Sequence, residues 1–260
     1  MFCRGLKLWS TDTNTYFDEA KQLYDQKVFD YIELFIVPDT FPSISRWKSL
    51  DIPYVIHTAY FTFGFNLADK DNASENLKIY QEVKAFSDEL DCKHIIFHGG
   101  VDGSVEETIR QLSAFDEKRA LIENKPYVAY EYLENEHRCI GHSPEEIQKI
   151  KEQVGCGFCL DFGHAICSAN SHKRNVYEYC RQFNRLKPQM YHFTDSKDIA
   201  SPYDDHSHLG KGEMDLEVIS EMIPDKAWVT VETKKDSADN LNDFIEDMSV
   251  LKKCFYDYKC

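Results

Sequence analysis

Short apolar segments alternate with longer amphipathic segments along most of the chain. The short segments have the length and composition of buried strands, with many Ile, Val, Tyr and Phe residues. They lie at residues 6–9, 31–37, 54–57, 94–98, 127–133, 157–160, 190–193 and 228–231. Amphipathic segments with helical spacing follow at residues 16–26, 43–50, 74–90, 105–115, 145–153, 176–186, 216–222 and 241–252. The pattern therefore predicts eight strand–helix units.

Eight units in 260 residues leave about 32 residues for each, which is the size of a βα repeat with short connections. Eight parallel strands close a (β/α)8 TIM barrel. An open doubly wound sheet is the alternative, and it usually has a glycine-rich turn after its first strand. Residues 10–14 contain no glycine. We therefore expect an α/β fold with one barrel domain over residues 1–260 and a tail at about 254–260.

Composition and charge narrow the function classes. Hydrophobic residues make up 42% of the chain, and the formal net charge is −15. This charge disfavours an open basic surface for nucleic acid, because binding phosphates requires Lys and Arg. No apolar run reaches the roughly 18 residues of a membrane span, and residues 1–10 do not resemble a signal peptide. Nine cysteines then indicate reduced thiols in the cytoplasm, and the Cys156/Cys159 pair is interpreted as part of a strand.

Metal-ligand residue types gather where six consecutive predicted strands end. In a barrel these ends share the rim at which chemistry takes place. A single His or carboxylate there is usually structural, and Glu33 inside the second strand is left open as an inward polar residue. Several carboxylates crowded in a buried mouth are costly unless a cation compensates them. His with Asp or Glu, and no Cys, suits Zn, Mn, Co or Fe. The residues are His57, His98, Glu134, Asp161, His164, His192 and Glu232, together with Asp204 and His206 in a loop.

The ordered set of motifs resembles the xylose isomerase-like TIM-barrel superfamily, which contains sugar isomerases, epimerases and the endonuclease IV family. The matching stretches extend from about residue 54 to residue 233. They are Ile56-His57-Thr58-Ala59-Tyr60, Ile96-Phe97-His98-Gly99-Gly100, Leu133-Glu134-Asn135, Leu160-Asp161-Phe162-Gly163-His164, His192-Phe193-Thr194-Asp195-Ser196-Lys197, the segment from Asp204 to Gly212, and Val231-Glu232-Thr233.

The endonuclease IV branch implies three zinc ions held by nine ligands, and all nine positions are filled. By this resemblance one metal takes His57, His98 and a bridging Glu134. A second shares Glu134 and adds the residues Asp161, His192 and Glu232. A third takes His164, Asp204 and His206. Glu134 is preferred to Glu131 because Asn135 follows it.

The isomerase and epimerase branch implies one metal, usually manganese or a similar ion, on Glu134, Asp161, His192 and Glu232. Glu134 and Glu232 are then the catalytic pair, one removing a substrate proton and the other returning it. The resemblance makes substrate contacts of four further residues, namely His57, His98, His164 and Lys197.

We favour the metal-dependent isomerase or epimerase, acting on a small sugar or sugar-derived substrate. The net charge and the absence of basic residues from 37–42 support it. The alternative is a zinc phosphodiesterase of the endonuclease IV type that cuts at abasic sites, and complete ligand retention supports that interpretation. A non-catalytic binding protein has no need of so many ligands. We expect one to three divalent ions, a carbohydrate partner rather than nucleic acid or membrane, and a barrel compatible with homo-oligomers.

Overall fold

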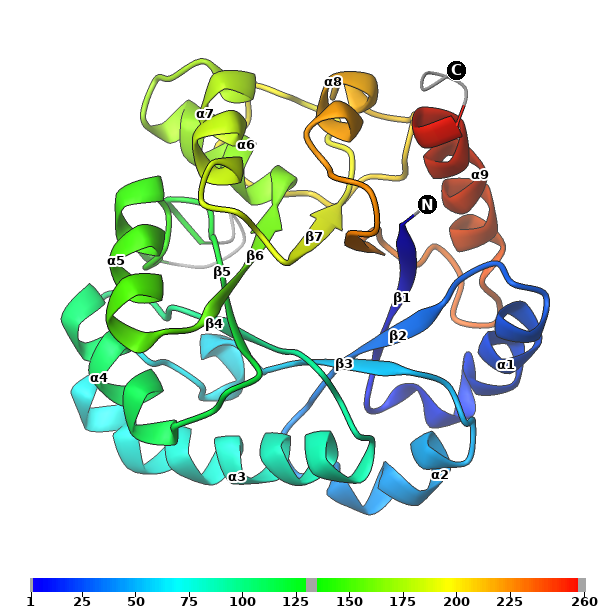
Figure 1. Cartoon of the computed structure of the whole chain (residues 1–260), viewed down its shortest axis with the longest axis horizontal. Helices are drawn as coiled ribbons and strands as arrows, with labels where there is room; N and C mark the ends of the chain where they lie inside the picture. Colours follow the sequence, from blue (N-terminus) through cyan, green and yellow to red (C-terminus); the bar gives the residue numbers. More distant parts are fainter. Residues whose placement is uncertain (1, 130–134, 257–260) are drawn as a thin grey trace.

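A computed structural model of the chain describes residues 2–129 and 135–256. Eight parallel strands form one closed barrel, and helices lie around its outside (Figure 1). Each strand pairs with the next, and Cys3 to Leu6 of the first pair in register with Trp228 to Val231 of the last. The strands are β1 (Cys3–Trp9), β2 (Tyr31–Phe35), β3 (Tyr54–His57), β4 (Ile95–His98), β5 (Ala120–Glu123), β6 (Gly157–Asp161), β7 (Met190–Phe193) and β8 (Trp228–Val231).

The helices connect successive strands and pack against the barrel from outside. They are α1 (Phe17–Asp25), α2 (Ile44–Lys48), α3 (Ala73–Glu89), α4 (Val105–Phe115), α5 (Pro144–Val154), α6 (Phe162–Ser171), α7 (Val176–Asn184), α8 (Leu216–Glu221) and α9 (Asn242–Tyr256). Side-chain caps start several of them. Ser104 accepts a hydrogen bond from the Glu107 amide, as its capping sequence predicts, and Ser143 caps α5 with Pro144 in the first turn.

The predicted TIM barrel is confirmed, and the predicted bounds of β3, β7, β8 and α4 agree with the structure. The fifth strand was predicted wrongly at residues 127–133, because barrel pairing with β4 and β6 involves Ala120–Glu123. Of the predicted segment, the described residues 127–129 form only an isolated bridge, between Val128 and Arg138. Helix α6, which starts directly after β6, was not foreseen.

The interior of the barrel is closed at one level by apolar side chains. These residues face inward from six strands and pack together as a separate cluster, namely Tyr31, Val55, Ile96, Leu121, Cys159 and Met190. Cys156 and Cys159 are free thiols and Cys159 is fully buried in this cluster, which agrees with the structural interpretation of the pair. This apolar level forms a floor beneath the polar residues that follow it along each strand.

The last described residues of the chain are helical. Helix α9 continues past the predicted end at residue 252, and Cys254 and Phe255 of the expected tail are buried in it. Residues 257–260 of that tail lie outside the described part. In the described residues, every helix is too short or too polar to cross a membrane.

Candidate metal centre

Strand periodicity gathers the polar residues of the centre. Side chains two residues apart on a strand point to the same face. Each inward apolar residue of the floor is therefore followed, two positions later, by an inward polar residue. Each of the eight strands supplies one inward polar residue. Six of these lie at or next to the carboxyl end of the strand, namely His57, His98, Glu123, Asp161, His192 and Glu232, and the other two, Lys7 and Glu33, lie two residues before it.

The first group of candidate ligands comprises His57, His98 and Glu123. The His57 Nε2 and His98 Nε2 atoms lie 2.8 Å apart, and the Glu123 Oε2 atom is 3.1 Å and 3.0 Å from them. Burial lowers the pKa of His98 well below its ordinary value, so the ring is neutral, as a metal ligand has to be. Two ring nitrogens and a carboxylate that converge on one point form a suitable cation site.

The second group comprises Glu123, Asp161 and His192, with Glu232 beside them. The His192 Nδ1 atom is 2.8 Å from Glu232 Oε2, 3.5 Å from Asp161 Oδ2 and 3.8 Å from Glu123 Oε1. Glu123 therefore presents one oxygen to each of the first two groups. A single carboxylate placed in this way can bridge two ions.

The third group comprises His164, Asp204 and His206. Asp204 Oδ2 lies 3.4 Å from His164 Nε2 and 2.7 Å from His206 Nε2. His164 is in the first turn of α6, where its amide donates to Asp161 Oδ1 at 2.7 Å. Asp161 therefore caps the helix with one oxygen and presents the other to the second group.

The second ring nitrogen of each histidine in this third group is fixed by a backbone carbonyl. His164 Nδ1 lies 3.0 Å from the Asn124 carbonyl, with Glu123 Oε1 also 2.8 Å away, and His206 Nδ1 donates to the Glu232 carbonyl at 2.9 Å. Both Nε2 atoms are therefore aimed at Asp204. Metal-binding histidines in proteins are usually held in this way.

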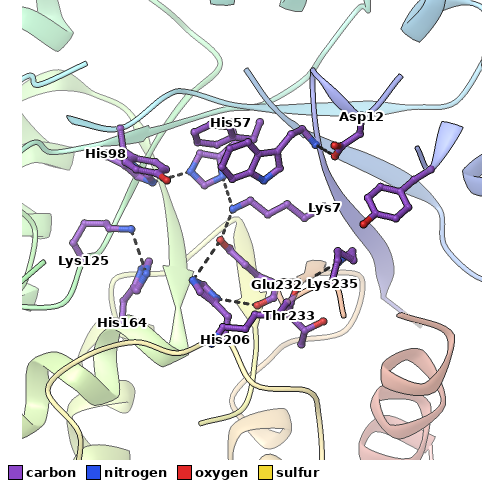
Figure 2. A pocket seen from close by; sticks show the side chains of 15 residues that line it. Lys7, Asp12, His57, His98, Lys125, His164, His206, Glu232, Thr233 and Lys235 are labelled. Carbon is purple, nitrogen blue, oxygen red and sulfur yellow. Dashed lines mark hydrogen bonds and ion pairs between the residues drawn. The ribbon is translucent and has the colours of Figure 1, made fainter. Parts of the chain in front are cut away.

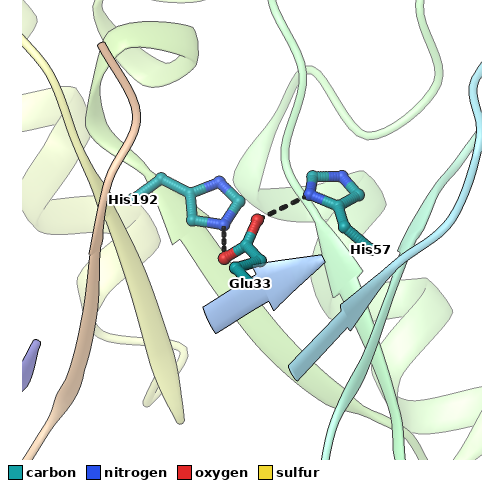
Figure 3. A group of neighbouring side chains, drawn as sticks. All are labelled: Glu33, His57 and His192. Atoms are coloured by element: carbon teal, nitrogen blue, oxygen red, sulfur yellow. Dashed lines mark hydrogen bonds and ion pairs between the residues drawn. The ribbon is translucent and has the colours of Figure 1, made fainter. Parts of the chain in front are cut away.

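Glu33 has the same role for the other two groups (Figure 3). Its Oε1 accepts from His57 Nδ1 at 2.7 Å, and its Oε2 accepts from His192 Nε2 at 3.0 Å. The Thr230 hydroxyl also donates to Oε2, at 2.7 Å. Glu33 is fully buried and orients one histidine ring in each of the two groups. The sequence left the role of this residue open, and in the structure it supports the candidate ligands from outside the groups.

The loop after β7 carries Asp204 and His206, and the buried Asp195 carboxylate fixes its backbone by hydrogen bonds. Asp195 accepts the backbone N–H groups of residues 196, 210, 212 and 214 at 2.8 to 3.1 Å. Gly212 has to be glycine, because a Cβ there would lie 2.3 Å from the Asp195 carboxylate. The sequence Gly210-Lys211-Gly212 therefore shapes the loop.

Several buried oxygens that face the groups have no hydrogen-bond partner among the described residues. They are Asp161 Oδ2, Glu232 Oε2 and both carboxylate oxygens of Asp204. Leaving such atoms unpaired is costly, and a divalent cation removes the cost. Together with the fixed histidine rings, these atoms show that the residues fit a cluster of divalent metal ions.

Cations already surround the carboxylates of the centre. Burial would raise the pKa of Glu123, but Lys125 lowers it well below the ordinary value. Burial would likewise raise the pKa of Glu232, and Lys7 is foremost in lowering it well below that value. Both acids are therefore ionised and available to metal ions.

The structure brings together all the predicted site residues that it describes except Lys197. Lys197 is exposed and lies in a neighbouring hollow beside Asp204 and Asp205. Glu134 and Glu131 lie outside the described residues, and among the described residues Glu123 is the carboxylate shared by the first two groups. The sequence signal that could have identified Glu123 is the triplet Ile122-Glu123-Asn124, which has the same residue types as Leu133-Glu134-Asn135.

Asn124, the last residue of this triplet, hydrogen-bonds to the neighbouring candidate ligands. Its side chain accepts from the Asp161 amide at 2.8 Å and donates to the Asp161 carbonyl at 2.9 Å. The amide group therefore fixes the end of the neighbouring strand, while its own carbonyl orients His164. One residue links the ligands of the second and third groups.

Three comparisons with known proteins bear on the centre. The model of a family described as "Xylose isomerase-like TIM barrel" matches residues 29–254. A curated relative from Aquifex aeolicus (strain VF5), "Probable endonuclease 4", is 27% identical over 236 residues, which cover 82% of this chain and 80% of the relative.

Two solved structures share the fold. A D-tagatose 3-epimerase-like protein has a TM-score of 0.73 and 18% identity, with 99% of this chain and 98% of that chain covered. Endonuclease IV from Thermus thermophilus has a TM-score of 0.67 and 16% identity, with 96% and 99% covered. Proteins similar to this chain thus carry the names of two different reactions.

Proposed function

Since the chain belongs to the xylose isomerase-like TIM-barrel family, we propose that it is an enzyme that hydrolyses a phosphate ester with a cluster of three divalent metal ions. Glu123 would help to hold the first two ions, with one oxygen for each, and His164, Asp204 and His206 would hold the third. Zinc suits the His and carboxylate ligands of all three groups.

The observation that carries this proposal is the third group. An isomerase or epimerase with one metal needs only the second group and Glu232. Apart from His164 as a substrate contact, it has no use for the third group, in which Asp204 and His206 converge with His164. This geometry moves our preference from the isomerase, which the sequence favoured, to the phosphoesterase.

The metal ions and the surrounding residues have different roles in the proposed reaction. The bound ions supply Lewis-acid stabilisation of the charge that develops on phosphoryl oxygens. Glu33 and Asn124 fix the ligands, so that little reorganisation accompanies the reaction. Trp9, Phe35 and Tyr60 line one side of the cavity above the centre.

The isomerase or epimerase remains a second candidate because of two carboxylates. Glu123 and Glu232 both border the second group, where one could remove a substrate proton and the other return it. Glu123 takes the place that the sequence gave to Glu134. This reaction requires exchange of a substrate C–H hydrogen with solvent, which deuterated buffer reveals.

The test uses zinc-loaded protein with p-nitrophenyl phosphate and bis-p-nitrophenyl phosphate as probes. We expect release of p-nitrophenol that falls at least about a hundredfold in Asp204→Asn, the size of loss typical for a group that stabilises developing charge. Asp198→Asn, on the same loop but exposed, is the matched control and should retain activity. Proton exchange on ketoses without phosphoester cleavage would instead support the isomerase and contradict the proposal.

A further inference from the structure

Four lysines line the cavity above the metal centre, namely Lys7, Lys125, Lys234 and Lys235, and two of them, Lys7 and Lys125, reach the candidate metal ligands (Figure 2). Lys7 comes from β1, and its Nζ atom lies 3.0 Å from His57 Nδ1 and hydrogen-bonds to Glu232 Oε1. Lys125 follows β5, and its Nζ atom lies 3.2 Å from His164 Nε2 and 3.4 Å from Glu123 Oε1. Their side chains are only 11% and 13% exposed, so both ammonium groups are inside the site.

Neither lysine is needed as a metal ligand, and both are costly to bury. Burial disfavours the charged form, and only the nearby carboxylates compensate it. Glu232 can keep both of its contacts, because Oε1 meets Lys7 while Oε2 faces His192. Lys7 therefore keeps its partner when the ligands hold metal ions. The two partners of Lys125, His164 Nε2 and Glu123 Oε1, would turn to the ions, which leaves its ammonium group available to another anion.

The charge balance then changes sign. The five carboxylates of the centre carry less charge than three divalent ions and two lysines together. The cavity becomes electropositive within a chain whose formal net charge is −15, and a focused positive cavity attracts anions. The carboxylates are Glu33, Glu123, Asp161, Asp204 and Glu232.

The cavity has the size and walls for a small molecule. Its volume is about 420 Å³, within the usual range for small-molecule sites. Trp9, Phe35 and Tyr60 form an aromatic wall, with ring centroids 4.8 Å apart for the first two and 5.4 Å apart for the second two. Trp9 is 38% exposed at the mouth, where a ring of the ligand can lie against it.

We propose that the natural substrate is a small phosphate ester rather than a nucleic-acid duplex, with its phosphate held by Lys7 and Lys125 and its organic part against the aromatic wall. The inference rests on the proposed function, since it names the substrate class of the same site. A duplex would need basic residues outside the cavity, and the loop at residues 37–42, near the mouth, contains none.

The test measures binding of inorganic phosphate to the metal-loaded full chain by isothermal titration calorimetry. Lys7→Met and Lys125→Met should each weaken phosphate binding by about tenfold or more, the usual scale for one charge-assisted hydrogen bond. Both should keep the metal content of the wild type. Lys7→Arg preserves the charge and should stay within about threefold of the wild type, and Lys211→Met, exposed on a loop, is the control.

The outcomes separate the inference from the proposed function. Phosphate binding that depends on both lysines supports the inference, even if no phosphoester is cleaved and the proposed function fails. Unchanged phosphate affinity in metal-loaded Lys7→Met and Lys125→Met would overturn the inference, even if p-nitrophenyl phosphate is cleaved. Tight binding of an abasic duplex with an affinity unchanged by Lys7→Met and Lys125→Met would also overturn the inference.

Discussion

Replacing Glu33 by Gln tests whether the buried carboxylate sets the metal affinity of the centre. The change keeps the shape of the side chain but exchanges one acceptor oxygen for a donor amide. The amide nitrogen cannot face Lys7, which is itself a donor 3.4 Å from Oε1. We therefore expect the remaining oxygen to stay with Lys7 and His57, and the amide group to face His192.

This exchange forces His192 into the tautomer that cannot bind a metal ion. His192 Nε2 now meets a donor and has to accept, so the proton moves to Nδ1, the atom that faces Asp161 and Glu232. A protonated nitrogen cannot bind a metal ion. Loss of an outer carboxylate typically weakens metal binding by about 10- to 100-fold, which corresponds to about 1.4 to 2.8 kcal/mol.

The expected result is selective. The second metal should leave first, while the third is retained, because backbone carbonyls and not Glu33 hold the rings of His164 and His206. The assay is dialysis against a chelator of intermediate strength, followed by elemental mass spectrometry. Glu82→Gln is the control, since that carboxylate accepts two backbone N–H groups away from the centre. Equal metal retention in Glu33→Gln and the wild type would refute the reasoning.

Three further predictions concern residues that bind no metal. Each Asp195 oxygen accepts two of the four backbone N–H groups, so Asp195→Asn puts a donor against two of them. It should lower the unfolding free energy by about 3 kcal/mol in urea and release the third metal, and unchanged values would argue against its role. Asn124→Ala should reduce phosphoester cleavage at least about tenfold without removing a ligand, as steady-state kinetics can show. Arg4 outweighs burial and lowers the pKa of Asp30 below 3.8, so Asp30→Asn should cost about 1 kcal/mol near neutral pH. That difference should vanish as the pH falls below this value, and urea titrations in which it persists would contradict the assignment.

Strand-end chemistry made most of the centre predictable from sequence. His57, His98, Asp161, His192 and Glu232 each follow a short apolar run, and parallel strands bring such ends to one rim. Lys7 and Glu33 were harder to assign, because they lie inside their strands and only the barrel register shows that they face the same cavity. A lysine on a strand carries no sign of its partner until β1 is paired with β8.

The fifth strand failed for a different reason. Residues 127–133 have more aromatic residues than residues 120–123, and β propensity favoured them. Tertiary pairing overrides that preference, because the four residues 120–123 fit between β4 and β6. The distance from α4 was the available signal. Only four residues separate Phe115 from Ala120, a usual connection, whereas the predicted strand left a gap of eleven residues.

Metal content per chain tests the central claim most directly. The measurement is elemental mass spectrometry of protein purified without chelators, repeated after zinc loading and dialysis. The account predicts about three divalent ions per chain, one for each group that Glu123 and Asp204 organise. A single bound ion would contradict the three-metal phosphoesterase and favour the isomerase, and no bound ion after loading would contradict the metal centre itself.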